Sequence, residues 1–372
     1  METILKDELR EKEKSQEIQS ETLKARVESL TRVKNNYSDE LLSNQITFKE
    51  VKEKTKGISS QKIKKVARRE HLSDTLFKYF VLAFGVLVVL LTIALACGLV
   101  INSRSIWSKF GLAFLWNSVW DPVAEKFGVL PFIYGTIVSS LLALFISVPL
   151  SIGSAVFLAE LAPKKISDIC CFLIEILAAI PSVVLGLMGI FLLVPAVRYI
   201  EPSLNHYLGF IPFFRGAPYG VCMLSASLIL SIMILPYITS ISREALLSVP
   251  KSLKEGLLAL GATRWEMIKM VSLPYARSGI MASIFIAFGR ALGETMAVTM
   301  VIGNTPKISL SLFDPSYSMA SVIANELAEA TSDMYVHALI ATGLVLFCIT
   351  ILINGIARLM LHRLVTRRVS AC

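Results

Sequence analysis

The sequence predicts an all-α integral membrane protein, with six membrane-spanning helices that follow a polar N-terminal extension. Of the 372 residues, 54% are hydrophobic and 17% are charged, and the mean hydropathy is +0.64. A soluble domain carries about 25% charged residues, so this composition argues against that class. Much of the charge lies in residues 1–74, which leaves the rest of the chain more apolar than the average.

Six apolar segments are long enough to cross about 30 Å of hydrocarbon as α-helices. They cover residues 77–101, 132–158, 169–197, 219–241, 279–303 and 335–360. These segments predict a six-helix transmembrane domain at residues 76–368. The polar residues 1–75 form a separate cytosolic extension, which lacks the apolar core of a cleavable signal peptide.

The extension has no strong structural signature of its own. Apolar residues in the segment 23–41 fall at heptad-like spacing, but Lys34 interrupts the row. A charged helix or a disordered arm is therefore favoured over a coiled coil. The basic run at 62–69 would favour contact with the anionic inner leaflet of a membrane.

The distribution of Lys and Arg predicts the orientation in the membrane. If six spans alternate, the segments on one side are rich in basic residues, and they are 68–71, 163–165, 243–277 and 358–368. The opposite loops hold Trp107, Trp116 and Trp120, which suit an outer interface. Cytoplasmic loops carry the excess of positive charge, so we expect both termini in the cytoplasm.

No motif of enzyme chemistry is present in the chain. The sequence has no Walker A pattern, GxGxxG, HExxH or nucleophile elbow. Its six cysteines form no CxxC motif or His/Cys cluster, and most fall within spans, where cysteine acts as a small apolar residue. We therefore expect no catalytic residue, cofactor site or metal site in this chain.

The basic loop at 242–279 begins with signals for a short helix. Ser252 and Glu255 fit a capping box, in which Ser252 precedes the helix and Glu255 closes back on it. The apolar residues 257–260 continue this helix. Gly261 is placed to end it, because a helix commonly stops at a glycine in the left-handed conformation.

A second short helix should follow directly. Thr263 and Glu266 form another capping box, which opens a helix towards Leu273. Pro274 then breaks that helix and can occupy the first turn of the next span. The loop therefore predicts a compact helical elbow against the cytosolic ends of two spans.

This elbow resembles the EAA loop of binding-protein-dependent ABC importer permeases. That family has Glu-Ala-Ala, then Gly, an aliphatic residue and Leu-Pro at fixed spacing. The residues at the matching positions are Glu255, Gly256, Leu257, Gly261, Val271, Leu273 and Pro274. Gly256 and Leu257 depart from the alanines in residue type but not in spacing. The resemblance implies the type I ABC importer permease fold, with a loop at about 243–277 that couples to an ATPase.

Four further stretches resemble the phosphate permeases of the PstC type. They are WDPVAEKFGVLPFIYGT (120–136), FLAELAP (157–163), AAIPSVVLGL (178–187) and GRALGETMAVTMVIGN (289–304). This resemblance implies a subunit of an ATP-driven importer that moves inorganic phosphate across a prokaryotic cell membrane by alternating access. The implied partners are a second homologous permease, an extracytoplasmic phosphate-binding protein and two ATPase subunits, which would bind ATP and magnesium.

Other functions stay open at this stage. Another oxyanion, such as sulfate or molybdate, could be the cargo, and only the phosphate-type stretches argue against it. The chain could instead be a secondary transporter or channel, although it has a docking loop and no duplicated pattern. A membrane-anchored scaffold would leave the charged residues inside the fifth span without a purpose.

Those charged residues are Arg290 and Glu294. In a continuous helix Arg290 lies roughly 18 Å from Ser278, near the middle of the membrane, and shares a face with Glu294. One interpretation is a structural ion pair between two buried charges. The other is a substrate path, in which Arg290 offers its guanidinium fork to phosphate and Glu294 holds it between passages. Ser182, which follows Pro181 in the third span, could line the same path.

Overall fold

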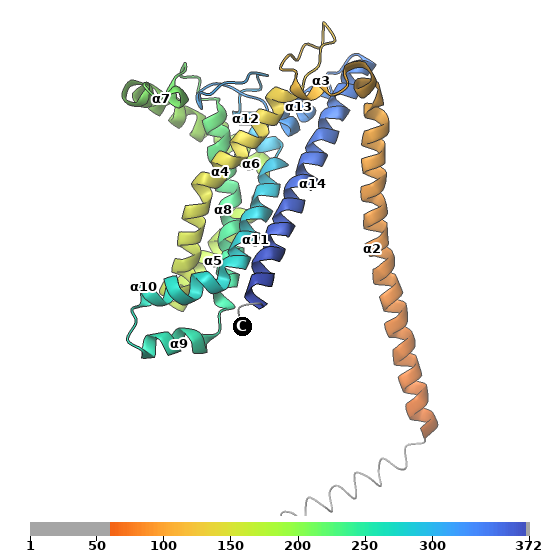
Figure 1. Cartoon of the computed structure of the whole chain (residues 1–372), viewed down its shortest axis with the longest axis vertical. Coiled ribbons are helices and arrows are strands. Elements are labelled where there is room, and N and C mark those ends of the chain that lie inside the picture. The colour runs from red at the N-terminus through yellow and green to blue at the C-terminus, as the bar shows by residue number, and fades with distance from the viewer. Residues whose placement is uncertain (1–59, 370–372) are drawn as a thin grey trace, which may run out of the picture. The chain divides into compact units, whose positions relative to one another are not determined.

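The computed structural model describes residues 60–369, which are drawn in colour in Figure 1. The heptad-like segment 23–41 lies outside the described residues. The chain divides into two units, Met1–Leu91 and Thr92–Cys372, and each is considered by itself. In the first unit the described residues are helical and belong to α2 (Ser60–Phe110), so the basic run at 62–69 is part of a helix.

Among the described residues, six helical stretches are long and apolar enough to cross a membrane, which confirms the predicted number. They are Thr75–Phe110, Leu130–Leu161, Ser182–Tyr207, Met223–Leu247, Arg264–Leu292 and Asp333–Arg363. Four of them agree closely with the predicted segments, and the third and fifth differ in ways that shape the candidate site.

The second unit is helical almost throughout (Figure 1). Its elements after α2 are α3 (Ala113–Trp116), α4 (Leu130–Val156), the π-helical turn η1 (Phe157–Leu161), α5 (Lys164–Ala179), α6 (Ser182–Met188), the π-helical turn η2 (Gly189–Leu193), α7 (Val194–Leu208), the short 3₁₀ helix η3 (Pro212–Phe214), α8 (Met223–Leu247), α9 (Lys251–Ala259), α10 (Arg264–Met267), the π-helical turn η4 (Ile268–Ser272), α11 (Leu273–Leu292), α12 (Met296–Val301), α13 (Met319–Glu326) and α14 (Asp333–Val369).

The third predicted span, 169–197, is wrong as a single helix. The chain forms α5, then an extended link at Ile180 and Pro181 with ψ angles of 127° and 137°, and only then α6. Proline disfavours the helical conformation of the residue before it, which explains the interruption at this point. The membrane-spanning stretch therefore begins at Ser182 and continues through α7.

The fifth predicted span, 279–303, is also interrupted. Its helix starts earlier, at Arg264, and ends at Leu292, with Gly293 as its C-terminal cap. After Glu294 and Thr295 the chain resumes as the short helix α12. Glycine has a low helix propensity, and here it stands where the helix ends. Residues 290 and 294 are consequently not on one continuous helix.

Helix α8 lies within the core of the second unit, packed against α4 and α11 (Figure 1). Its buried side chains join those of α4, α6, α11 and α12 in one apolar cluster. Small residues allow close approach: a Cβ on Gly279 would lie 2.4 Å from the Cβ of Ala245. The hydroxyls of Ser242 and Ser283 lie 2.9 Å apart and link α8 to α11. Such small and hydroxyl-bearing contacts are typical of helix packing in membranes.

The two interrupted spans meet through α6 and α12. A Cβ on Gly186 would lie 3.0 Å from the Cα of Ala297, and a Cβ on Gly189 would lie 2.9 Å from a methyl carbon of Val301. Residue numbers rise together along both helices, so α6 and α12 run in parallel. Their first turns, after the breaks at Pro181 and Gly293, therefore lie at a similar level.

Candidate functional site

The elbow between α8 and α11 begins with α9, and this helix ends as predicted. Gly261 has a φ of +89°, in the left-handed region that favours glycine. Its N–H donates to the carbonyl of Leu258 at 3.0 Å, and the N–H of Ala262 donates to the carbonyl of Leu257 at 3.4 Å. This pair of hydrogen bonds is the Schellman motif, and it turns the chain sharply towards α10.

The two predicted capping boxes have different outcomes. The second forms: the Thr263 hydroxyl accepts from the N–H of Glu266 at 3.3 Å, and the Glu266 carboxylate accepts from the N–H of Thr263 at 2.8 Å. The first prediction is wrong, because Pro250 is the N-cap and Ser252 and Glu255 lie inside α9. The carbonyl of Pro250 already accepts the N–H of Leu253, so the helix starts before Ser252.

Pro274 does not break the helix as predicted. The chain stays helical from Arg264 to Leu292, and Pro274 lies in the first turn of α11, one residue after Leu273. The preceding turn, η4, is π-helical. Proline has no N–H to donate to a helical carbonyl, and we attribute the wider turn before it to this missing hydrogen bond.

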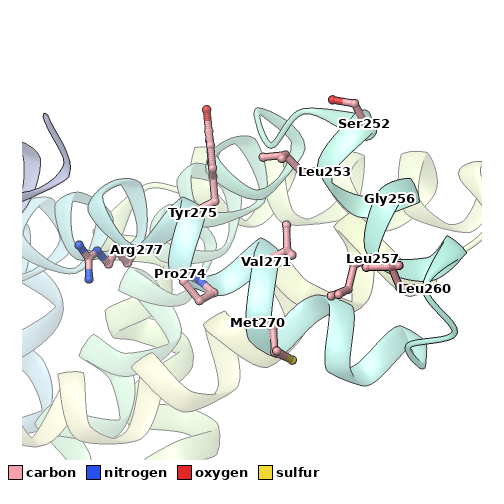
Figure 2. A pocket seen from close by; sticks show the side chains of 10 residues that line it. All are labelled: Ser252, Leu253, Gly256, Leu257, Leu260, Met270, Val271, Pro274, Tyr275 and Arg277. Carbon is pink, nitrogen blue, oxygen red and sulfur yellow. The ribbon is translucent and has the colours of Figure 1, made fainter. Parts of the chain in front are cut away.

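The two arms of the elbow enclose an open groove of about 770 Å³. Figure 2 shows its lining, with Leu253, Gly256 and Leu257 from α9 facing the arm that carries Val271 and Pro274. Exposed apolar side chains of Leu253, Leu260 and Met270 line the groove, and Leu258 and Trp265 are exposed elsewhere on the elbow. Exposed apolar residues gathered on one element mark an interaction surface.

The EAA-like positions are divided between the surface of the elbow and its packed side, where Leu257, Val271 and Leu273 are half-buried. Glu255 and Gly256 are exposed on α9, and Gly261 is exposed at the turn. A Cβ on Gly256 would meet nothing within 4 Å, so the alanine that is common in the family would fit without strain. The replacement of the family's alanine by Gly256 therefore leaves the shape of the elbow unchanged.

A buried ion pair, which the sequence analysis did not identify, attaches the elbow to η1, the π-helical turn that follows α4. The Nζ atom of Lys254 lies 2.7 Å from Oε1 of Glu160, and their side chains are only 15% and 5% exposed. Lys254 also donates to the carbonyl of Leu246 at the end of α8, at 3.3 Å. Glu160 lies in FLAELAP, a stretch recognised for its resemblance, but nothing in the sequence indicated its partner.

A second contact fixes the corner between α4 and α5. Arg243 of α8 donates to the hydroxyl of Ser167 at 3.3 Å, and that hydroxyl donates to the carbonyl of Leu158 at 2.9 Å. The corner is thus attached to α8 by Arg243 and to α9 by Lys254. Movement of the elbow would therefore act directly on α4 and α5.

The predicted pair of Arg290 and Glu294 does not form. The ion pairs among the described residues are Lys109–Glu125, Lys254–Glu160 and Lys307–Asp314. Arg290 lies in the last turn of α11, whereas Glu294 follows the break at Gly293 and is half-buried. The i, i+4 argument failed because it assumed an unbroken helix.

The Arg290 side chain instead lies over an aromatic ring. Its guanidinium carbon is 4.4 Å from the ring centroid of Tyr237 on α8, and the arginine is exposed. The Tyr237 hydroxyl donates to the carbonyl of Ala178 at 3.3 Å, in the last turn of α5. Ser182 begins α6 just beyond that turn and is half-buried. The predicted path residues thus lie around the two helix breaks.

The described residues form six apolar spans, and two of these spans border a helix break near the exposed Arg290. Together with the exposed elbow between α8 and α11, these features indicate a membrane permease. Residues 147–369 match the family described as binding-protein-dependent transport system inner membrane component. The chain therefore belongs to that family of ABC importer permeases and, by the relatives described next, to its PstC group. It is accordingly a multi-pass inner membrane protein that works with ATPase and binding-protein partners.

The relatives are similar over most of the chain. A phosphate transport system permease protein PstC of Mesorhizobium japonicum is 45% identical over 81% of this chain and 93% of its own length. The protein of the same name from Pasteurella multocida is 44% identical over 79% of this chain and 93% of its own. A probable phosphate transport system permease protein PstC of Methanocaldococcus jannaschii is 38% identical over 70% of this chain and 85% of its own length.

Proposed function

We propose that this chain is the permease subunit of an ATP-driven importer that carries inorganic phosphate into a prokaryotic cell by alternating access. The observation that supports this most is the 45% identity, over 81% of the chain, to a protein named as a phosphate transport system permease. The three relatives reported above carry that name, which favours phosphate over sulfate or molybdate. Membership of an ABC importer family also disfavours a secondary transporter or channel.

The proposed assembly contains four kinds of subunit. This chain pairs with a second, homologous permease, two ATPase subunits dock on the cytosolic side, and an extracytoplasmic binding protein delivers phosphate. ATP and magnesium bind to the ATPase subunits, and this chain contributes no catalytic group. The exposed apolar elbow supports the docking role, because its leucines and Trp265 need a partner to cover them.

Within this chain the elbow passes ATPase movement to the spans. Glu255, Gly256 and Gly261 shape the docking helix and its stop, and Leu273 and Pro274 join the elbow to α11. The buried contact of Lys254 with Glu160 supports a direct link to α4 as well. A displacement of α9 would then move both helices together.

Arg290 is the proposed phosphate contact on the transport path. It is exposed, it lies at the end of α11 beside the breaks in two spans, and none of the ion pairs in the described part of the chain includes it. A planar guanidinium can donate two parallel hydrogen bonds to phosphate oxygens. Ser182 at the start of α6 is the proposed neutral neighbour on the path, and Glu294 after the break is the proposed acidic one.

The cargo assignment is tested with the complete complex in liposomes. We expect ATP-dependent uptake of inorganic phosphate that needs the binding protein, both permeases and the ATPase. A large excess of sulfate or molybdate should leave this uptake unchanged. Uptake of sulfate or molybdate in place of phosphate would contradict the cargo, and uptake without ATPase subunits would contradict the transporter class.

The orientation is a separate prediction, with both termini in the cytoplasm. In a background without native cysteines, a cysteine at position 165 or 251 should be protected from an impermeant thiol reagent in intact cells, because both replaced lysines would face the cytoplasm. A cysteine at position 307 should react. Lys165 and Lys251 are exposed, so changes at these two positions disturb little structure. The Lys307 side chain is 56% exposed and therefore open to the reagent, although its partner Asp314 is only 18% exposed. Labelling at position 251 from outside would reverse the orientation.

A further inference from the structure

The guanidinium of Arg290 lies over the ring of Tyr237, in a contact that leaves its positive charge in place. The guanidinium carbon lies 4.4 Å from the ring centroid, within the range of a cation–π contact. Arg290 comes from α11 and Tyr237 from α8, so the contact joins two packed helices. Tyr237 is half-buried among them, whereas Arg290 is exposed.

An aromatic ring and a carboxylate hold an arginine in different ways. A carboxylate occupies the N–H groups at the edge of the guanidinium and cancels its charge. A ring contacts the face of the group and leaves its N–H donors and its charge available. An anion that approaches Arg290 would therefore displace no acidic partner before it could form a bidentate pair.

The hydroxyl of Tyr237 extends this arrangement to the interrupted third span. It donates to the carbonyl of Ala178 at 3.3 Å, and Ala178 precedes the extended link at Ile180 and Pro181. The orientation of the ring is thus set by α5 as well as by α8. A shift of α5 against α8 would turn the ring and, with it, the guanidinium that rests on the ring.

We propose that Tyr237 is the positioning residue of the anion path, which holds the Arg290 guanidinium over its ring so that the N–H donors of the arginine receive the phosphate. This role replaces the one expected of Glu294, which the sequence analysis had placed beside Arg290. The inference rests on the proposed function, because it assigns Tyr237 a task only if Arg290 contacts the transported anion.

The test measures uptake of inorganic phosphate per assembled complex for Tyr237→Leu, which removes the ring, and for Tyr237→Phe, which removes only the hydroxyl. We expect the leucine variant to lose about threefold to tenfold in uptake, as the loss of one cation–π contact implies. The phenylalanine variant should lie between it and the unchanged protein. Tyr199→Leu on α7 is the matched control, since Tyr199 is 85% exposed, and it should transport normally.

The decisive comparison repeats Tyr237→Leu in an Arg290→Lys background. A lysine ammonium has no plane to orient, so removing the ring should have little further effect there. If Tyr237→Leu lowers uptake by the same factor in both backgrounds, or transports normally by itself, the positioning role is overturned and the proposed function stands. If Arg290→Lys alone transports normally, the phosphate contact of the proposed function fails first, and the role of Tyr237 fails with it.

Discussion

Reversing one charge of the buried pair, by Lys254→Glu, should abolish phosphate uptake. The variant would place a second carboxylate beside Glu160, where both side chains are less than one-fifth exposed. Breaking a buried ion pair costs about 3–5 kcal/mol, and like charges at the same place cost more. We expect α9 to detach from the end of α4, so that the complex hydrolyses ATP without transport or loses its ATPase. Uptake, ATPase activity and the amount of co-purified ATPase are the measurements.

The exchanged pair Lys254→Glu with Glu160→Lys is the informative companion, because it restores opposite charges at the same two positions. It should recover a large part of the uptake that either single reversal loses. Lys251→Glu is the matched control: it reverses a lysine on the same helix, and Lys251 is exposed, so uptake should stay near normal. Normal coupling in Lys254→Glu, or no recovery in the exchanged pair at equal assembly, would contradict a role for this contact in coupling.

Two local signals in the elbow were confirmed, whereas the capping box of Ser252 and Glu255 and the helix break at Pro274 were wrong. Gly261 ends α9 in the left-handed conformation, and Thr263 and Glu266 form their capping box. These features depend on residues within a few positions of one another, so the sequence contains the whole interaction. The six spans were predicted for a similar reason, because length and apolar composition decide whether a helix can cross a membrane.

The residues that interrupt two spans are present in the sequence, but both spans were predicted as unbroken helices. Pro181 and Gly293 lie within apolar segments long enough to span, and apolar length alone predicts an unbroken helix. Membrane helices tolerate proline and glycine where neighbouring elements satisfy the freed backbone groups. Whether a helix continues through such a residue or breaks there depends on how the helix packs. Here the relevant contact is that of α6 with α12.

The contacts that build the site join residues far apart in the chain. Lys254 and Glu160 are 94 positions apart, and Tyr237 and Ala178 are 59 apart. No periodicity or spacing rule connects such positions, so one sequence could indicate the residues but not their partners. Arg290 was recognised as exceptional because it is charged within an apolar segment, which is a property of the residue itself. Nothing in the sequence around Tyr237 indicated that the fold would bring it next to Arg290.

Removing Arg290 should stop phosphate transport while the complex still assembles. Because Glu294 does not pair with Arg290, Arg290→Met leaves no buried carboxylate without its partner, and a loss of uptake reports on the arginine itself. Arg290→Lys keeps the charge but loses the planar fork, and one lost charge-assisted hydrogen bond of about 1.5–3 kcal/mol corresponds to roughly a tenfold to hundredfold loss. The control Arg198→Lys, which alters an exposed arginine of α7, should transport near normally.

The double variant Arg290→Met with Glu294→Leu separates the two original interpretations. Charges with only a structural role can often be replaced by apolar residues of similar volume without loss, so near-normal uptake would exclude a phosphate contact at Arg290. A phosphate contact cannot be replaced in this way, because methionine offers no hydrogen-bond donor to the anion. We expect an assembled complex with intact ATPase binding and no phosphate uptake, measured as transport of labelled phosphate per complex in liposomes. Because the guanidinium rests on Tyr237 and not on a carboxylate, removing Glu294 as well should make the defect of Arg290→Met neither better nor worse.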